Sequence, residues 1–261
     1  MVAAIIQARM GSARLPGKVA LEIMEKTVLE YVIERVKKAK HIENTIVATT
    51  IKKEDSVVAD LAGSLGVGVY RGADEDVLDR FYQAAKLFGI KHIVRITADC
   101  PLIDPQIIDK VVEVYFRSNV DYCSNTLKET FPDGEDVEVF SFNALHGAWK
   151  NAKLLSEREH VTPYIKKNPD KYKPANLEND TDLSYKRWTV DTKEDFRFIK
   201  AVLEALYPKK PDFGMEDILE FLERNPHIEK MNKGIMRNEG YTKSLREDKI
   251  INVDYTKEQD G

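Results

Sequence analysis

The stretch AAIIQARMGSARLPGKVALE, residues 3–22, joins an apolar run to a loop that is rich in glycine and basic side chains. The run at 3–8 has the composition of a buried strand. Gly11, Ser12 and Gly17 allow the backbone of the loop to approach a ligand closely. In open α/β sheets, ligands bind beyond the carboxyl ends of the strands, which is where this loop would lie. The stretch therefore predicts an α/β fold with a ligand-binding loop directly after its first strand.

The loop is not the phosphate-binding loop of P-loop NTPases, whose pattern is G-x-x-x-x-G-K-[ST]. Five residues separate Gly11 from Gly17, one more than the pattern allows. Val19 follows Lys18, so the hydroxyl that would bind magnesium is missing. Pro16 also removes a backbone N–H of the kind that such loops direct at phosphates. A metal ion would therefore have to be held by residues elsewhere in the chain.

Three cations still favour phosphate binding by this loop. Arg9, Arg14 and Lys18 lie within ten residues of one another. Guanidinium and ammonium groups are well suited to phosphate oxygens. A solvated basic loop would have the same composition, so chemistry alone leaves both interpretations open.

The first half of the chain alternates short β-rich runs with helical patterns. The strands are predicted at 3–8, 45–50, 66–70 and 92–97, and the helices at 27–40, 55–65, 75–88 and 105–118. Such alternation indicates βαβ units and a mostly parallel sheet. In the second half we expect strands at 136–142 and 187–192, and helices at 143–152, 156–168, 193–207 and 214–224. The helix at 156–168 would stop or kink near Pro163.

One domain is expected over residues 1–225, with an insertion or dimerisation region at about 125–185. A polar C-terminal extension would occupy 226–261, with a frayed end at 257–261.

The composition excludes several classes of protein. The formal net charge is −4 and no basic stripe stands out, so nucleic acid is not an expected partner. Two cysteines, Cys100 and Cys123, offer neither a disulfide framework nor a metal-ligand cluster. We find no signal peptide and no apolar run of the ~20 residues that span a bilayer. We therefore expect a cytoplasmic protein that is not associated with a membrane.

Two aspartates follow predicted strands and are candidate ligands for Mg²⁺. Asp99 comes directly after the strand at 92–97, and Asp191 lies at the end of the strand at 187–192. Carboxylate oxygens together with phosphate oxygens can complete an octahedral magnesium site, provided the two strands are neighbours. The plainer interpretations are a turn aspartate for Asp99 and helix capping for Asp191.

Neighbouring residues are better explained by structure than by chemistry. We interpret Cys100 as a packing residue, because no His or Asn partner supports a nucleophile. Asp104 is predicted to cap the helix at 105–118, and Thr192 with Asp195 to cap the helix at 193–207.

Three motifs in order resemble one family of enzymes. The segments are IIQARMGSARLPGKVA (5–20), RITADCPLIDP (95–105) and VDTKEDF (190–196). They are similar to motifs of the cytidylyltransferases that make CMP-activated acidic sugars, the CMP-Kdo synthetase and acylneuraminate cytidylyltransferase family. The match is greatest in the branch called spore coat polysaccharide biosynthesis protein F, and covers roughly residues 3–200. Two departures are Gln7 and Lys193, where many members have proline.

The resemblance implies a Rossmann-like nucleotide-diphospho-sugar transferase fold with a mostly parallel central sheet and a small insertion in the second half. It implies CTP as substrate and assigns roles by position. Arg9, Arg14 and Lys18 would bind the triphosphate and act in catalysis, and Asp99 and Asp191 would hold Mg²⁺. Nucleotide contacts would come from Gln7, Ala8, Gly11, Ser12, Arg71 and Gly72. Asp74 is expected to begin the helix that follows Arg71 and Gly72.

The acceptor pocket is implied by two further segments, GEDVEVF (134–140) and REHVTPY (158–164). They place Asp136, Glu138, Arg158 and His160 near the acceptor. Each also has a plain structural interpretation, since Glu138 would face solvent from an alternating strand and Arg158 would lie on a helix surface. His160 has the ordinary pKa of an acid–base group, although the chemistry of the family does not require one.

The predicted function is transfer of CMP from CTP to a hydroxyl of an acidic sugar, with release of pyrophosphate, in surface polysaccharide or glycoconjugate biosynthesis. The acceptor stays open between Kdo and sialic-like sugars, as does the preference for CTP over other nucleotides. A homodimer is expected by analogy with the family.

Two alternatives come from other classes. One is a glycosyltransferase of related fold, although TADCP (97–101) lacks the D-x-D-like pair that such enzymes use. The other is a non-catalytic sugar-nucleotide-binding protein, which would be expected to have lost Lys18 or one of the two aspartates.

Overall fold

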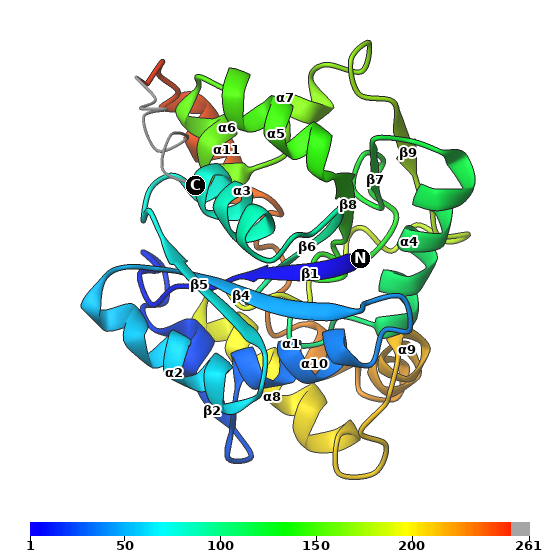
Figure 1. Cartoon of the computed structure of the whole chain (residues 1–261). Helices are drawn as coiled ribbons and strands as arrows, with labels where there is room; N and C mark the ends of the chain where they lie inside the picture. Colours follow the sequence, from blue (N-terminus) through cyan, green and yellow to red (C-terminus); the bar gives the residue numbers. More distant parts are fainter. Residues whose placement is uncertain (252–261) are drawn as a thin grey trace.

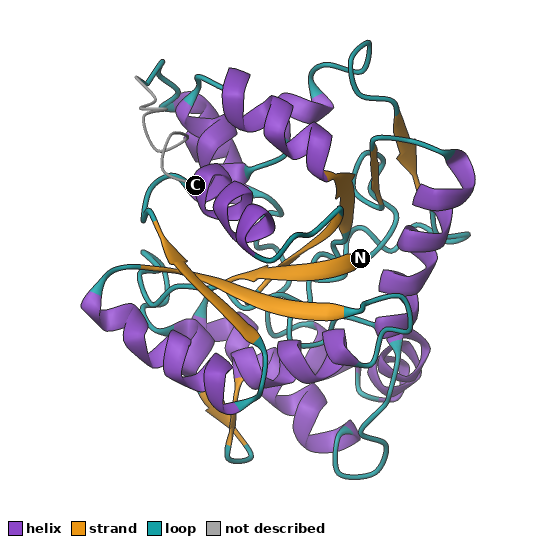
Figure 2. Ribbon diagram, viewed as in Figure 1, coloured by secondary structure: helices purple, strands orange, loops and turns teal. Residues whose placement is uncertain are grey.

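The protein is described here over residues 1–251 of a computed structural model, in which a seven-stranded sheet has helices on both faces (Figures 1 and 2). The strands of this sheet are β1 (Val2–Gln7), β4 (Asn44–Thr50), β5 (Gly68–Gly72), β6 (His92–Thr97), β7 (Tyr122–Ser124), β8 (Glu138–Ser141) and β9 (Pro174–Asn176). A separate two-stranded sheet pairs β2 (Glu22–Ile23) with β3 (Lys26–Thr27).

The α-helices of the described chain are α1 (Val28–Lys37), α2 (Ser56–Ser64), α3 (Val77–Leu87), α4 (Pro105–Ser118), α5 (Phe142–Asn151), α6 (Leu155–His160), α7 (Pro163–Lys166), α8 (Lys193–Leu206), α9 (Met215–Arg224), α10 (Pro226–Glu229) and α11 (Glu239–Arg246). Two 3₁₀ turns are η1 (Lys18–Ala20) and η2 (Lys53–Asp55). None of the helices within residues 1–251 has the length and apolar character needed to cross a membrane.

The sheet has the order β5-β4-β1-β6-β8-β7-β9. β1 lies between β4 and β6 and runs parallel to both, and β5 extends this parallel half. β8 pairs antiparallel with both β6 and β7, and β9 pairs parallel with β7, so within the described sheet β8 alone runs against the other strands. The predicted α/β class and mostly parallel sheet are confirmed. Segment 125–185, predicted as an insertion, contributes β8 and β9 to this same sheet.

Residues 2–6 of β1 are all apolar and buried, which suits a strand that is covered on both faces. Ala4 and Ile6 belong to a core that includes α1, α4 and α8, whereas Ala3 and Ile5 belong to a second core with α3 and α5. Figure 1 shows α1, α2 and α8 on one side of the sheet and α3, α5 and α6 on the other. The loop that follows β1 therefore starts from a strand that is packed on both faces.

The strand predicted at 187–192 is wrong. Arg187 forms only an isolated bridge with Asp133, and the N–H of Val190 donates to the carbonyl of Asp99 at 2.8 Å. The backbone of this segment thus divides its hydrogen bonds between two different partners, so no ladder forms. Polar and apolar residue types alternate over 187–190 with the period of a strand, but period does not specify the hydrogen-bond partner, and all four side chains are buried.

One further prediction needs correction. Asp74 does not begin α3, because Asp76 is the N-cap and accepts from the N–H of Asp79 at 2.9 Å. The interruption predicted near Pro163 is confirmed, since the segment 156–168 forms two helices, α6 and α7, which are separated by a tight turn at Val161 with φ of 69°. Caps at Asp104 and Thr192 are confirmed.

The C-terminal segment folds back over the sheet. We call residues 236–251 the C-terminal strap, which contains α11. Near its end, Leu155 donates to the carbonyl of Lys249 at 3.0 Å and Ile251 donates to that of Lys153 at 2.9 Å. Figure 1 shows α11 beside α6, on the same side of the sheet as α3. The end predicted to fray, 257–261, lies outside the described residues.

Candidate active site

The loop after β1 is held by its own backbone and by one carboxylate. The N–H groups of Ser12 and Gly17 both donate to the carbonyl of Met10 at 2.9 Å. The N–H of Met10 donates to Oδ1 of Asp55 at 2.6 Å. Gly17 has φ of 70°, a left-handed conformation that glycine adopts without strain, and it leads into η1. This bend directs Lys18 toward the carboxyl end of the sheet.

Lys18 lies between the two predicted metal ligands. Its Nζ donates to Oδ2 of Asp99 at 2.6 Å and to Oδ1 of Asp191 at 2.6 Å. Burial would raise the pKa of Asp99, but the charge and hydrogen bond of Lys18 hold it lower, at about 2. The same two carboxylates raise the pKa of Lys18 against the lowering effect of burial. The structure thus brings Asp99 and Asp191 together, although Asp191 does not end a strand.

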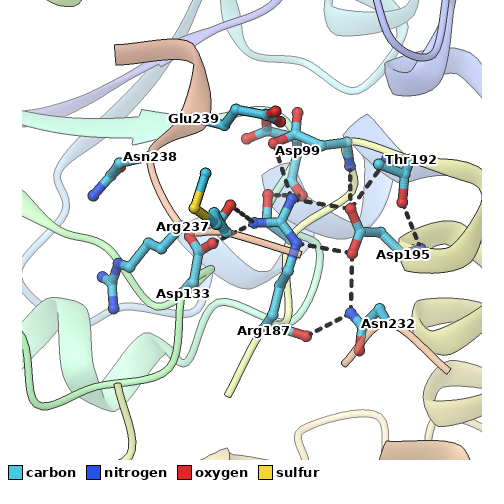
Figure 3. A network of polar contacts seen from close by, with 12 residues as sticks. Asp99, Asp133, Arg187, Thr192, Asp195, Asn232, Arg237, Asn238 and Glu239 are labelled. Atoms are coloured by element: carbon cyan, nitrogen blue, oxygen red, sulfur yellow. Dashed lines mark hydrogen bonds and ion pairs between the residues drawn. The ribbon is translucent and has the colours of Figure 1, made fainter. Parts of the chain in front are cut away.

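Arg187 fixes Asp191 in this position by a hydrogen bond to its carboxylate. Figure 3 shows Arg187 between Asp133 and Asp195 in the same network. Arg187 donates to Asp133 at 2.6 Å, to Asp195 at 2.9 Å and to Asp191 at 3.1 Å. Asp195 also accepts from the N–H groups of Asp191 and Thr192, and it caps α8. The role of Asp195 at the helix start was predicted, whereas Arg187 was missed. No periodic pattern indicates this role of Arg187, because the segment around it is neither helix nor strand.

Two adjoining hollows form a cleft at this edge of the sheet. The first, of about 700 Å³, lies between the loop after β1 and the C-terminal strap. Its walls include the predicted residues Gln7, Ala8, Arg9, Gly11, Ser12, Arg14, Lys18 and Asp99, together with Glu239, Lys243 and Arg246 of the strap. The strap residues were not predicted to line the site. The second hollow, of about 400 Å³, shares Gln7, Arg14, Asp99 and Glu239 with the first.

Both loop arginines contact carboxylates. Arg9 lies 3.3 Å from Asp74, and Arg14 lies 2.8 Å from Asp191 and 2.5 Å from Glu239. Anionic groups entering the first hollow would meet guanidinium groups that are already oriented toward it. A multiply charged anion could exchange with these carboxylates, because the exposed guanidinium groups are not locked in a buried network.

The second hollow contains most of the predicted acceptor residues. Glu138 is buried and pairs with Arg95 and, at 3.4 Å, with Lys166, so the interpretation that it faces solvent is wrong. Burial would raise the pKa of Glu138, but the charges of Lys166 and Arg95 hold it well below its usual range. Asp136 also lines this hollow and pairs with Arg237 at 2.6 Å.

His160 reaches the second hollow from the end of α6. Its Nε2 lies 3.0 Å from Oγ of Ser244, and its ring packs edge-on against Tyr241. Burial lowers the pKa of His160 to about 4, with Glu159 opposing this shift. The imidazole is therefore neutral near pH 7, and its contacts with Ser244 and Tyr241 join α6 to the strap.

Three predicted residues do not line either hollow among the residues that the structure describes. Arg158 is fully buried, bound to Asp76 at 2.6 Å and to the carbonyl of Trp149, so it is not a surface residue either. Arg71 donates to the carbonyls of Thr50 and Lys52 at the end of β4. Gly72, next to it, is buried in β5.

Arg80 is a residue that sequence reasoning missed. Its side chain is buried on α3 and lines a small pocket with Gln7, Ala8 and Arg9. Within residues 1–251, its Nε and Nη1 atoms have no hydrogen-bond partner. Burial, and after it the charge of Arg9, lowers the pKa of Arg80 to about 10. Buried donors without partners are costly, so they indicate a ligand that satisfies them. An arginine within the apolar face of the predicted helix was the available signal.

The chemistry of Asp99 and Asp191 fits a hard divalent cation such as Mg²⁺, which prefers oxygen ligands. Residues 1–251 contain no group of three or more His, Cys, Asp or Glu side chains arranged to hold a metal. Two carboxylates make only a partial ligand set. Mg²⁺ is commonly bound in this way, by one or two carboxylates together with substrate phosphates and water.

Comparison with known proteins agrees with these features. A family model described as cytidylyltransferase matches residues 3–243. The protein MJ1063 of Methanocaldococcus jannaschii, described as uncharacterized, is 44% identical over 245 residues, which are 93% of this chain and 97% of that protein. The spore coat polysaccharide biosynthesis protein SpsF of Bacillus subtilis is 34% identical over 229 residues, 85% of this chain and 94% of that protein.

Two more comparisons add an enzyme and a solved structure. The 3-deoxy-manno-octulosonate cytidylyltransferase of Solibacter usitatus is 36% identical over 135 residues, 51% of this chain and 52% of that enzyme. The structure of a cytidylyltransferase from Leptospira borgpetersenii superposes with a TM-score of 0.84 at 37% identity, over 90% of this chain and 99% of that one. The chain belongs to the cytidylyltransferase family and is a CTP-dependent nucleotidyltransferase.

Proposed function

We propose that this cytidylyltransferase transfers CMP from CTP to a hydroxyl of an acidic sugar and releases pyrophosphate. The observation that supports it most is the meeting of Lys18, Asp99 and Asp191 at the carboxyl end of the sheet, with Arg9 and Arg14 beside them. In this reaction the acceptor oxygen forms a bond to the α-phosphorus, and the bond from that phosphorus to the β-phosphate oxygen breaks. Positioning and charge neutralisation are then the main catalytic tasks.

The first hollow would hold the nucleotide. Arg9, Arg14 and Lys18 would neutralise the triphosphate, with backbone groups of Gly11 and Ser12 close to it. Lys18 would act on charge that grows on the departing pyrophosphate, so its effect would be greater in the transition state than in the ground state.

The nucleoside would lie toward the small pocket of Gln7, Ala8 and Arg80. The unpaired nitrogens of Arg80 offer hydrogen bonds to acceptor groups of a pyrimidine base. Arg80 would therefore take the place that sequence reasoning assigned to Arg71 and Gly72.

Asp99 and Asp191 would hold Mg²⁺ against the phosphates. When bound, Mg²⁺ supplies Lewis-acid stabilisation of charge on the phosphoryl oxygens. Arg187 would keep Asp191 oriented for this purpose, because it donates to Asp191 and to its neighbour Asp195.

The acceptor would occupy the second hollow. Arg95 and Lys166 both pair with one buried carboxylate, Glu138, and they are the cations at this wall of the hollow with which a sugar carboxylate would pair. Asp136 and Glu138 offer acceptors for sugar hydroxyls. The names of the relatives in Solibacter usitatus and Bacillus subtilis support an acidic sugar and a polysaccharide pathway. Arg158 would act only indirectly, through Asp76 at the start of α3.

The wider setting is also proposed by analogy with the family. We infer a homodimer, formed through the segment at 125–185, that works in the cytoplasm for surface polysaccharide or glycoconjugate synthesis. Light scattering on the purified protein would measure the oligomeric state directly.

A pyrophosphate-release screen tests the function. The enzyme with Mg²⁺ is given each of four nucleoside triphosphates with a panel of acidic sugars, including Kdo and sialic-like sugars. We expect release with CTP and an acidic sugar. We also expect Asp99→Asn to lower kcat by at least about a hundredfold, because transition-state charge stabilisation is lost. Asp60→Asn, an exposed carboxylate on α2, is the matched control. Release with neutral sugars only would contradict the acceptor class, and full activity of Asp99→Asn would contradict the metal site.

A further inference from the structure

The Lys18 ammonium occupies the position between the two metal-binding aspartates. Its Nζ is 2.6 Å from one oxygen of Asp99 and 2.6 Å from one oxygen of Asp191. A magnesium ion bound to both carboxylates at about 2.0–2.1 Å would require the same space. Lys18 and the metal therefore exclude one another at this point.

The contact of Lys18 with Asp99 and Asp191 is largely shielded from solvent, and it joins groups of opposite charge. The Lys18 side chain is only 12% exposed, and those of Asp99 and Asp191 are 22% and 18% exposed. Attraction between opposite charges is only weakly screened by salt in such a setting. Removing Lys18 from the pair without a replacement cation would leave Asp99 without its ion-pair partner, so the lysine is held firmly.

We propose that Lys18 is a placeholder for the metal, so that a divalent cation enters only after nucleotide phosphates have drawn the ammonium away from Asp99 and Asp191. This inference rests on the proposed function, because it takes Asp99 and Asp191 as the metal ligands. It makes nucleotide and metal binding positively coupled, and by thermodynamic linkage the coupling is reciprocal.

Residues and space around Lys18 allow both steps of this exchange, which are the withdrawal of the ammonium and the entry of the metal. Lys18 borders the first hollow, so a triphosphate placed there lies within reach of its flexible side chain. Asp191 retains Arg14 at 2.8 Å and Arg187 at 3.1 Å when Lys18 leaves, which keeps it oriented. Because residues 1–251 provide no third side-chain ligand here, phosphate oxygens are needed to complete the metal's coordination. The same triphosphate would therefore remove the competitor and supply the missing ligands.

Binding of Mn²⁺ to the nucleotide-free protein tests the inference. Free Mn²⁺ is followed by electron paramagnetic resonance during titration of the wild type, of Lys18→Met and of the double variant Lys18→Met/Asp99→Asn. We expect Lys18→Met to bind Mn²⁺ about 5- to 150-fold more tightly than the wild type, the range of typical coupling energies. The double variant should lose this gain. Lys210→Met, which removes a lysine paired with Asp217 outside the cleft, should bind Mn²⁺ as the wild type does.

The outcomes distinguish the placeholder role of Lys18 from the assignment of Asp99 and Asp191 as metal ligands. If the wild type already binds Mn²⁺ tightly and loses it in Asp99→Asn, the metal site stands and the placeholder is overturned. Equal weak binding by the wild type and Lys18→Met, together with turnover that depends on Asp99, overturns the placeholder in the same way. A gain in Lys18→Met that persists in the double variant overturns the metal assignment of the proposed function. Thermal melts check folding, and Lys18→Gln, which keeps hydrogen-bond donors, replaces Lys18→Met if that variant unfolds.

Discussion

At the scale of single residues, Arg80 is a buried side chain that lowers the stability of the fold and that we propose to contact the nucleotide. Two nitrogens of its buried guanidinium have no partner among the described residues, and burial lowers its pKa to about 10. A buried charge without hydrogen bonds costs stability. Arg187 is the opposite case, since its donors meet Asp133, Asp191 and Asp195. Arg80 thus has donors that a ligand could satisfy, whereas the donors of Arg187 are satisfied by carboxylates of the protein itself.

Substitution of Arg80 should therefore weaken CTP binding without lowering the stability of the fold. We expect Arg80→Met to weaken CTP binding by about 10- to 100-fold, which corresponds to the loss of hydrogen bonds to a charged donor. The thermal midpoint should stay equal or rise, because methionine buries no charge. Calorimetry with CTP and differential scanning calorimetry measure the two effects. Inorganic tripolyphosphate is the control ligand, and its affinity should hardly change because it has no base. A large fall in the thermal midpoint with unchanged CTP affinity would make Arg80 a structural residue.

At the scale of elements, the junction of α6 and α7 carries backbone strain beside the cleft. Val161 has φ of 69° and ψ of −57°, and the N–H of Thr162 donates to the carbonyl of His160 at 2.8 Å. This geometry is a three-residue γ-turn of the strained type. A β-branched residue avoids positive φ, so the turn needs support from its surroundings. It sends His160 toward α11 and lets Thr162 donate to Glu138 at 2.6 Å.

The link between α6 and α11 should weaken in acid. The pKa of His160 is lowered to about 4 in the folded protein, against about 6.5 in an unfolded chain. The unfolded chain then binds more protons between these values, so stability is complete above about pH 6.5 and is lost as pH falls toward 4. Protonation is opposed by burial and by Arg95 and Lys166, and favoured by Glu159 and Glu138.

Urea unfolding at several pH values measures this effect. We expect His160→Gln to lose the part of the pH dependence between about pH 5 and 6.5 that one histidine supplies, at most about 1.4 kcal/mol per pH unit. His227→Gln, on the exposed side of α10, is the matched control and should keep the wild-type slope. Equal slopes in the wild type and His160→Gln would show that His160 titrates in the folded state as it does in the unfolded chain.

At the scale of the whole molecule, much of the fold could be predicted from the sequence because strands with helices between them leave a clear period. β1, β4, β6 and the helices that follow them are where the pattern placed them. The site was predicted from local motifs, and Lys18, Asp99 and Asp191 do meet. The strap was not expected in the cleft, because its contacts with α6 join residues 84 and 92 positions apart. No local pattern encodes such a contact.

The strap forms one wall of the first hollow and is held by polar contacts near both of its ends. Glu239 accepts from Arg14 at 2.5 Å near its start, and Asp248 accepts from the N–H and Oγ of Ser156 at 3.1 and 2.8 Å near its end. These contacts hold the wall of the first hollow in place. Loss of the contacts at one end should therefore weaken nucleotide binding while the core stays folded.

Replacement of Asp248 by alanine tests this role of the strap. The variant loses two hydrogen bonds to a carboxylate, worth about 1.5–3 kcal/mol, so opening of α11 becomes correspondingly easier. We expect amide hydrogen exchange in α11 to accelerate by roughly 10- to 100-fold, while β1 and β6 keep their protection. KM for CTP should rise with less change in kcat, since Asp248 contacts no reacting atom. Asp182→Ala, an exposed carboxylate that accepts only a local bond from Ser184, is the matched control. Unchanged exchange in α11 would mean that its packing against α6, rather than the fastening at Asp248, holds the strap closed.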